Sequence, residues 1–181
     1  MAENIQITVT NARLSYANIF RAKAMEGSTG EPKFSCVFLL DKKQNAKDIK
    51  TIQDAIAKLV KEGLKGKHPG AEKVCLKDGS VKADTDGYGP EVMFVSAGNV
   101  KRPVIVNRDR SPLAEEDGKP YSGCYVNGVF NLWVQDNKYG RRINASLTHV
   151  QFVKDGEQFG EKVKPAEAVL PDLSAEDDDA V

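Results

Sequence analysis

The sequence has few of the residues on which disulfide frameworks, metal centres and acid–base active sites depend. Of its 181 residues only three are cysteines and two are histidines. Cys36, Cys75 and Cys124 show no CxxC spacing, and His68 and His149 are far apart, so neither a zinc site nor a Cys–His or Ser–His–Asp arrangement is supported. The sequence therefore predicts no metal, no cofactor and no catalytic site.

Long apolar runs and phosphate-binding loops are also missing. No stretch approaches the ~18–20 apolar residues of a membrane span. The segment 63–70, GLKGKHPG, lacks P-loop spacing, and 84–87, DTDG, is not followed by the later ligands of a calcium loop. The opening residues, MAENIQITVT, show no charged-then-apolar leader, so we expect a reduced protein of the cytoplasm. Binding is therefore favoured over catalysis.

The net charge of zero hides a division between a basic body and an acidic end. Up to Lys164 the chain holds 26 basic and 20 acidic residues, whereas residues 165–181 hold six acids and no base. This asymmetry indicates a polyanionic partner with which the tail competes, although a merely solubilising tail explains the charges equally well. The tail residues concerned are Asp172, Glu176, Asp177, Asp178 and Asp179.

Hydrophobic periodicity predicts several short strands and one clear helix. Residues 5–9 alternate, and the apolar phase resumes one residue out of step at Ala12, which predicts a β-bulge near Thr10–Asn11. A helical stripe over residues 45–64, with Asn45 as N-cap, predicts an amphipathic helix. The remaining expectations are loops at 17–31 and 107–121, a long connection at 66–90, and strands at 33–40, 91–97, 104–106, 122–135 and 141–154.

This order of elements predicts a mainly β protein. Short separated strands and one inserted amphipathic helix, joined by long polar loops, are typical of a partly open antiparallel barrel. We expect residues 1–171 to form this domain and residues 172–181 to be a disordered acidic tail, because the tail is charged and almost without apolar residues.

The last two strands have one register that satisfies both faces of a hairpin. Pairing Asp136 with Arg141 places Val134 opposite Ile143 on an apolar inner face, and the outer face then carries amides, hydroxyls and two aromatic rings. A four-residue loop, 137–140, would connect the strands. This register predicts that Tyr125, Trp133 and Arg142 point away from the core.

Aromatic rings beside cations on a solvated sheet face are what single-stranded nucleic acid requires, because bases stack on the rings while cations follow the phosphates. The alternative is that these rings pack beneath a loop or the C-terminal segment. Basic loops elsewhere in the chain add further candidates, and together with the hairpin they would line one groove. The candidate DNA-binding residues are Tyr16, Phe20, Arg21, Lys23, Lys101, Arg102, Arg108, Tyr125, Trp133, Tyr139, Arg141 and Arg142.

Several segments resemble, in order, a family of bacteriophage single-stranded DNA-binding proteins first catalogued as a domain of unknown function. They are ITVTNARLSYANIF, DTDGYGPEVMFVSAGN, KRPVIVNRDRSPL, YSGCYVNGVFNLWVQDNKYGRRINASLTHVQFVKDGEQFG and the acidic tail. The resemblance covers roughly residues 5–171. It implies an oligonucleotide-binding (OB) fold, sequence-independent binding of single-stranded DNA in phage replication and recombination, and an acidic tail that recruits replication proteins. Such tails often end in an aromatic residue, whereas this one ends in DDDAV.

Two other functions fit the same sequence. One is an adaptor whose sheet face binds a protein partner. The other is a metal-dependent nuclease or recombination enzyme that uses carboxylates such as Asp84, Asp86, Asp109 and Glu115. Whether the chain is a monomer or a homodimer, and whether duplex DNA or RNA also binds, is not determined by these patterns.

Overall fold

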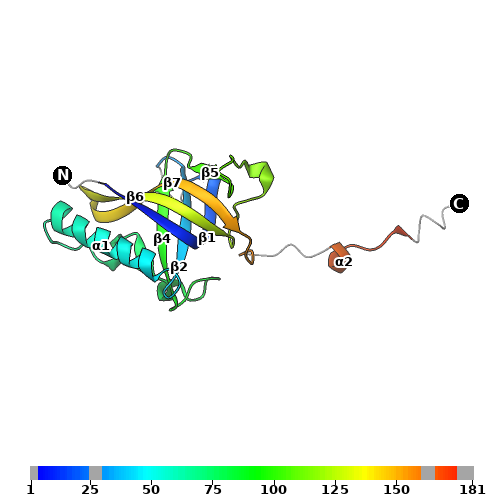
Figure 1. The fold of residues 1–181 in the computed structure, drawn as a ribbon, viewed down its shortest axis with the longest axis horizontal. Coiled ribbons are helices and arrows are strands. Elements are labelled where there is room, and N and C mark those ends of the chain that lie inside the picture. Colours follow the sequence, from blue (N-terminus) through cyan, green and yellow to red (C-terminus); the bar gives the residue numbers. More distant parts are fainter. Residues whose placement is uncertain (1–3, 25–29, 160–165, 175–181) are drawn as a thin grey trace.

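The computed structural model describes residues 4–24, 30–159 and 166–174, and most of its regular structure is β-strand (Figure 1). The elements, in chain order, are β1 (Ile5–Lys23), β2 (Lys33–Asp41), α1 (Ala46–Gly63), the 3-10 helix η1 (Ala71–Lys73), β3 (Leu76–Asp78), the 3-10 helix η2 (Gly79–Lys82), β4 (Val92–Asn99), β5 (Val104–Val106), the 3-10 helix η3 (Glu115–Asp117), β6 (Tyr125–Asn137), β7 (Gly140–Lys154) and α2 (Ala166–Val169).

Five strands form a barrel in the order β4–β2–β1–β6–β7, with antiparallel neighbours. The barrel closes where β7 meets β4 again, through a single parallel pair, Gly98 with Ser146. Cys75 adds a second link, since its N–H donates to Ile143 O at 3.0 Å and its carbonyl accepts from Ser96 N at 3.2 Å. The predicted mainly β barrel is confirmed, and this seam between β4 and β7 is its weakly paired side.

The barrel interior is apolar and is covered at one side by the helix. Phe38 and Phe130 are fully buried, with ring centroids 5.7 Å apart. The α1 helix packs against β1, β2 and β6, and it buries Ile52 and Leu59 in the same core. The helix predicted at 45–64 is therefore confirmed, because its apolar stripe has this core to face.

Asn45 is the N-cap residue of α1, as predicted, and its carbonyl accepts from the Ile49 N–H at 2.9 Å. Its side chain makes no capping bond to α1. Instead its Oδ1 accepts from the Asp41 N–H at 2.9 Å, and its Nδ2 donates to the Thr10 carbonyl at 2.9 Å. The buried Asn45 amide thus joins β1 to the end of β2, a tertiary use that local spacing does not reveal.

The first strand is longer than predicted. The bulge near Thr10–Asn11 is confirmed, since the pairing with β6 shifts between Val9 and Ala12 and Asn11 has φ of 52°. The loop predicted at 17–31 is wrong for residues 17–23, where β1 continues beside β2. Two further register shifts break the period-two pattern there, so the sequence does not look like a strand. Residues 25–29 lie outside the described residues.

The hairpin register is confirmed residue by residue from Asn131–Ser146 to Asp136–Arg141. Its connection is tighter than predicted, because Asn137 and Gly140 also pair and only Lys138 and Tyr139 remain as the loop. A register shift after Val129 changes the pairing further along the strands.

The outer face of β2 is buried as well as its inner face. Val37, Leu39 and Phe94 of β2 and β4 form a second apolar cluster with Tyr88. Tyr88 comes from the connection before β4, which contains β3 and two 3-10 helices and is not a plain loop. Among the described residues, no helix has the length and apolar content needed to cross a membrane.

Candidate nucleic-acid interface

The ring of Tyr125 lies between two cations on the outer face of the barrel. Tyr125 begins β6 and is half-buried, whereas the next residue, Val126, is fully buried, so the strand turns the ring outward. Tyr125 pairs with Arg13 on β1 and with Lys154 on β7. The Lys154 Nζ lies 4.8 Å and the Arg13 Cζ 6.0 Å from the ring centroid. We call Arg13, Tyr125 and Lys154 the Tyr125 site.

Arg13 is held firmly in this position. Its Nε donates to the Gly123 carbonyl at 3.1 Å and an Nη donates to the Glu157 carbonyl at 2.8 Å. Its guanidinium also lies 4.1 Å from the centroid of Phe159, well inside cation–π range. Arg13 is not among the residues predicted from the sequence, although the predicted bulge and the apolar Ala12 and Leu14 on either side indicate that its side chain faces outward.

Residues 155–159, which we call the C-terminal strap, run against this site. The Tyr121 hydroxyl donates to Asp155 Oδ1 at 2.8 Å, and the Phe159 N–H donates to the Ser122 carbonyl at 3.1 Å. The strap passes so near the chain that a Cβ on Gly123 would lie 2.1 Å from a strap carbonyl. These contacts hold the Phe159 ring against the barrel.

An open pocket of about 450 Å³ lies beside the Tyr125 site. Tyr16 is 51 % exposed there and adopts φ of 46°, an unusual conformation for a bulky residue and one that is typical of functional sites. We call this cavity the Tyr16 pocket. Its lining residues are Ser15, Tyr16, Asp84, Thr85, Asp86, Ser122 and Phe159.

Lys82, which no sequence pattern indicated as a site residue, lies over the aromatic rings beside the pocket. The Nζ of Lys82 is 5.4 Å from the Tyr16 centroid, 5.7 Å from Tyr88 and 5.5 Å from Phe94. The Tyr88 hydroxyl donates to Ser15 Oγ at 3.3 Å, and burial raises the pKa of Tyr88. The phenol therefore stays neutral at physiological pH and adds no negative charge.

The hairpin tip carries a second group of candidates. Trp133 is half-buried on the outer face of β6 opposite Asn144, and Tyr139 is 78 % exposed at the turn. Arg141 lies 3.5 Å from Asp136, which offsets part of its charge. Arg142 is exposed.

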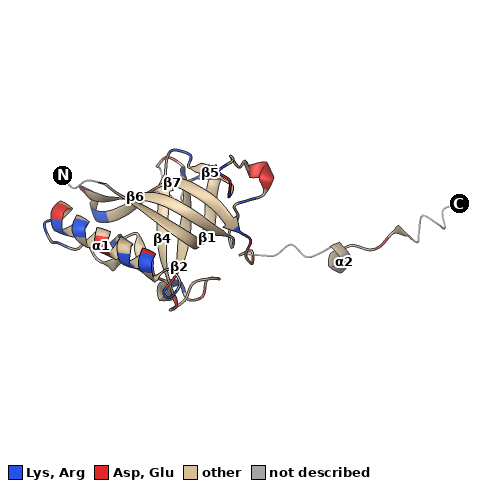
Figure 2. Cartoon of the chain, in the orientation of Figure 1, with Lys and Arg blue, Asp and Glu red and all other residues tan. Residues whose placement is uncertain are grey.

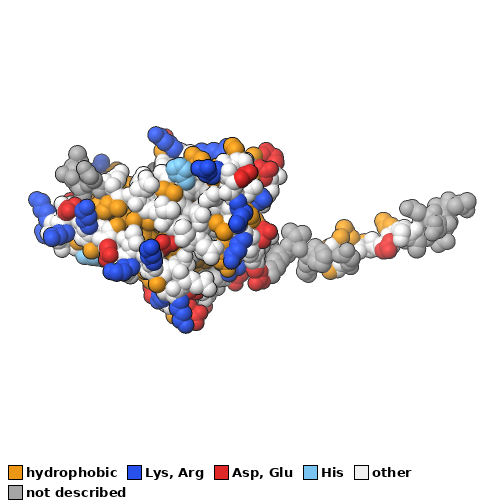
Figure 3. Space-filling view, viewed as in Figure 1, with side chains coloured by type: hydrophobic (Ala, Val, Ile, Leu, Met, Phe, Trp, Pro, Cys, Tyr) orange, Lys and Arg blue, Asp and Glu red, His pale blue; other side chains and the backbone are white. Residues whose placement is uncertain are grey.

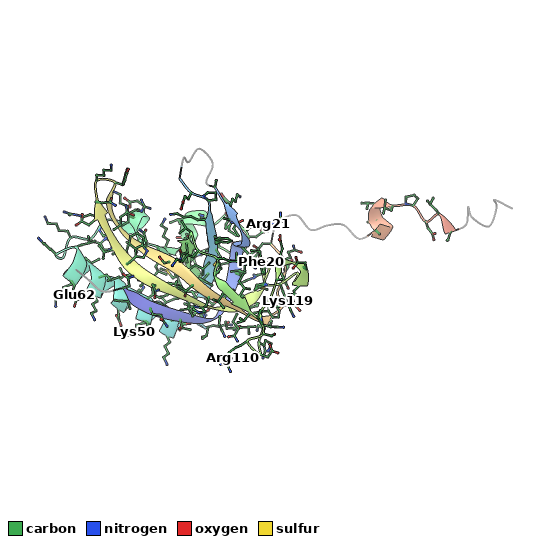
Figure 4. All side chains as sticks on the ribbon, turned by 90° about the horizontal axis from the view of Figure 1, so that it is seen from above. Phe20, Arg21, Lys50, Glu62, Arg110 and Lys119 are labelled. Atoms are coloured by element: carbon green, nitrogen blue, oxygen red, sulfur yellow. The ribbon has the colours of Figure 1, made fainter. Side chains whose placement is uncertain are left out.

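A third group lies at the end of the barrel opposite the Lys50 and Glu62 side chains of α1 (Figure 4). The Arg102 guanidinium is 5.7 Å from the Phe20 centroid, and Phe20 itself packs partly against the core. Arg21 is bound 2.9 Å from Glu115 of η3, which is visible as an acidic turn in Figure 2. DNA phosphates would have to displace Glu115 to reach Arg21.

The other predicted cations differ in whether their side chains make hydrogen bonds or ion pairs within the protein. Arg108 donates from Nη1 to the Val153 carbonyl beside a small open pocket. Lys23 and Lys101 are exposed, and their side chains make no hydrogen bond or ion pair within the described part of the chain, which is also true of Arg142. Basic side chains gather over α1 and at the opposite end of the barrel (Figure 3).

The candidates therefore form separate groups. The Tyr125 site and the Tyr16 pocket adjoin each other through the contact between Arg13 and Phe159. Trp133 lies eight residues further along β6, roughly 26 Å at the rise of a strand. Asp172 is exposed, and the other predicted tail residues, Glu176, Asp177, Asp178 and Asp179, lie outside the described residues.

Only two of the four carboxylates of the nuclease alternative are brought together. Asp84 and Asp86 line the Tyr16 pocket, whereas Glu115 is bound by Arg21. Asp109 accepts two hydrogen bonds from Ser111, which lower the pKa of its carboxyl. No group of three or more His, Cys, Asp or Glu within the described ranges is placed to hold a metal ion.

A five-stranded barrel in this order, with rings and cations on its outer face, defines an oligonucleotide-binding protein of the OB-fold class. The chain belongs to the family described as the ssDNA-binding protein of Enterobacter phage Enc34, which matches residues 5–181.

Individual relatives agree with this membership. The chain is 34 % identical over 166 residues to protein p50 of Acyrthosiphon pisum secondary endosymbiont phage 1, covering 86 % of each chain. It is similar to the single-stranded DNA-binding protein of bacteriophage Enc34 in complex with ssDNA, with a TM-score of 0.77 and 33 % identity over 86 % of this chain and 89 % of that one. Gp2.5 of bacteriophage T7, a single-stranded DNA-binding protein, shares the fold at 15 % identity and a TM-score of 0.53, with 91 % and 98 % covered.

Proposed function

We propose that this protein binds single-stranded DNA without regard to sequence, as a non-catalytic component of phage DNA replication, recombination or repair. The observation that carries the proposal is the Tyr125 ring between Lys154 and Arg13 on the outer face of the barrel. A base stacks on such a ring, and the two cations then lie beside its phosphates. Membership of the phage family and its DNA-bound relative support the same function.

The proposed path of the DNA strand follows the outward-facing aromatic rings. Bases stack on Tyr16 and Tyr125, and further along on Trp133 and Tyr139 at the hairpin tip. Phosphates contact the cations between and around these rings, and Phe20 with Arg102 extends the path at the far end. The proposed phosphate-binding residues are Arg13, Arg21, Lys23, Lys82, Lys101, Arg102, Arg108, Arg141, Arg142 and Lys154.

The position of the Tyr16 pocket fits the way OB folds bind oligonucleotides. These folds use the outer face of their second and third strands, here β2 and β4, together with the loop between the last two strands. In this chain Tyr88 and Phe159 pack on part of that face, over Val37, Leu39 and Phe94. The DNA strand is therefore directed to the rim of this face, where the Tyr16 pocket is open.

The acidic tail, residues 172–181, is proposed to compete with DNA for the basic body and to recruit replication or recombination proteins. In support, the C-terminal strap, which precedes the tail along the chain, ends with Phe159 in the wall of the Tyr16 pocket. Residues 1–171 are proposed as the binding domain, working in the cytoplasm of the host cell, where single-stranded replication intermediates occur.

Binding of labelled single-stranded, duplex and RNA oligonucleotides, with and without magnesium, tests this function. We expect single-stranded DNA to bind most tightly, and the logarithm of the affinity to fall linearly with the logarithm of salt concentration, by ~0.7 per phosphate contact. We also expect the DNA to stay intact over time. A flat salt response would rule out the cationic path.

The same measurements separate the other functions. An adaptor protein would shift none of the oligonucleotides and would capture a protein partner instead. A nuclease would degrade the DNA in the presence of magnesium. Sedimentation of the free protein would show whether it is a monomer or a homodimer.

A further inference from the structure

We propose that the Tyr16 pocket is a nucleobase-binding site that prefers bases with an exocyclic amine, namely cytosine, adenine and guanine, over thymine and uracil. The proposal deepens the single-stranded DNA binding proposed above and rests on it. It concerns one nucleotide position, so the rest of the bound strand remains unselected.

The pocket has the size and the walls of a site for a flat aromatic ligand. Its volume of about 450 Å³ lies within the ordinary range for small-molecule sites. Tyr16 and Phe159 both line it, from β1 and from the C-terminal strap. The Phe159 ring packs against Gly87, where only a glycine leaves room, because a Cβ at this position would lie 2.4 Å from the ring. Two aromatic side chains at one cavity are suited to stacking on a base.

Cations flank both aromatic walls. Lys82 lies 5.4 Å from the Tyr16 centroid, and Arg13 lies 4.1 Å from the Phe159 centroid. These charges are placed to meet the phosphates on either side of a base held between the walls. The pocket therefore lies on the proposed strand path.

The polar lining consists mainly of hydrogen-bond acceptors. Asp84 and Asp86 contribute two carboxylates, and within the described ranges neither of them makes a hydrogen bond or an ion pair. Ionised carboxylates only accept hydrogen bonds. They are suited to the amine of cytosine, adenine or guanine, and carboxylates are a usual partner of the cytosine amine.

Thymine and uracil fit this lining poorly. Each presents two carbonyl oxygens around a single N–H, so a carboxylate that accepts from that N–H is brought near like partial charges. Hydroxyls of Ser15, Thr85 and Ser122 in the same pocket can donate to the ring nitrogen and carbonyl of cytosine.

The test compares oligo-dC with oligo-dU of equal length, because these bases differ at the amine-bearing edge and neither has a methyl group. We expect the full-length protein to bind oligo-dC about fivefold or more tightly than oligo-dU, the lower end of what one base contact contributes. In the Asp84→Ala/Asp86→Ala variant the ratio should fall to near one, with oligo-dU bound at least as tightly as before.

Asp54→Ala/Glu62→Ala is the matched control, since it removes two exposed carboxylates from α1 and leaves the pocket intact. It should preserve the dC-to-dU ratio. Thermal unfolding of each variant checks that it folds, and Asp84→Asn/Asp86→Asn replaces the alanine variant if that one does not.

Equal affinities for oligo-dC and oligo-dU in the unmodified protein would overturn the base preference, whatever the variants do. If the preference for oligo-dC persists in the Asp84→Ala/Asp86→Ala variant, it arises at another site, and the proposal is equally overturned. Absence of binding to every oligonucleotide would instead refute the proposed function itself.

Discussion

At the scale of single residues, Trp133 tests base stacking directly. Trp133→Ala should weaken binding to oligo-dT by about 1–3 kcal/mol, the usual contribution of one stacked base. The melting temperature should barely change, because the ring lies on the outer face of β6. Fluorescence titration is well suited to the unmodified protein, since its only tryptophan reports on this position alone.

Asn131→Ala, two residues earlier on the same face, is the matched control and should bind nearly as well as the unmodified protein. Unchanged affinity in Trp133→Ala with intact thermal stability would show that the ring packs on the protein and does not contact DNA.

The three cysteines give a residue-scale prediction about pH. Burial raises the pKa of Cys75 to about 12 and that of Cys124 to about 11, and it raises the pKa of the fully enclosed Cys36 thiol further still. At pH 8 all three are therefore neutral thiols, and the reactive thiolate is scarce. We expect no reaction with a thiol reagent in the native protein and three equivalents after denaturation.

The same raised pKa values determine how the stability of the protein depends on pH. Because the folded pKa values exceed the unfolded value of 9.0, the free energy of unfolding should fall as the pH rises above about 9. Rapid labelling at pH 8 under native conditions would mean that the barrel opens far more often than its buried core implies.

At the scale of an element, β6 depends on a glycine for its packing. A Cβ on Gly128 would lie 2.4 Å from the ring of Phe38, which is fully buried and stacked on Phe130. Gly128→Ala should therefore destabilise the protein by about 1–3 kcal/mol, the ordinary cost of overpacking. For a chain of this size that lowers the melting temperature by about 2–4 °C per kcal/mol.

Val129→Ala is the matched control on β6. The Val129 side chain, next to Gly128, faces outward and is only half-buried. This substitution should change the melting temperature much less. Equal melting of Gly128→Ala and the unmodified protein would show that the Phe38 ring has room to move.

At the scale of the whole molecule, the division of charge predicts the effect of the tail. Deleting residues 172–181 removes five acids and should raise the affinity for single-stranded DNA by about fivefold or more at low salt, the lower end of ordinary coupling free energies. The gain should shrink as salt rises, because the competition is electrostatic. Fluorescence anisotropy over a salt series measures both.

A full-length variant with Asp172, Glu176, Asp177, Asp178 and Asp179 changed to the corresponding amides separates charge from chain length. Its affinity for single-stranded DNA should match that of the deletion variant. If truncated and full-length proteins bind alike at moderate salt, the tail does not compete with DNA.

Local patterns predicted most of the barrel correctly. Hydrophobic patterns located β2, β4, β5 and both hairpin strands, and period-two alternation set the hairpin register, because a slip of one residue exposes an apolar face. The same patterns failed for residues 17–23 of β1, where repeated register shifts erase the alternation. They also could not show that the Asn45 amide links two strands.

The patterns of the sequence by themselves determined the mainly β fold class, the two faces of the hairpin and the outward position of Tyr125 and Trp133. These features follow from side-chain periodicity, which acts over a few residues. Only the tertiary structure decided which residues meet. It brought Arg13 to Phe159 across 146 positions of sequence. It also placed Asp84 and Asp86 beside Tyr16 and separated the hairpin tip from both. Such contacts depend on the closure of the barrel and the path of the strap, which no local pattern encodes.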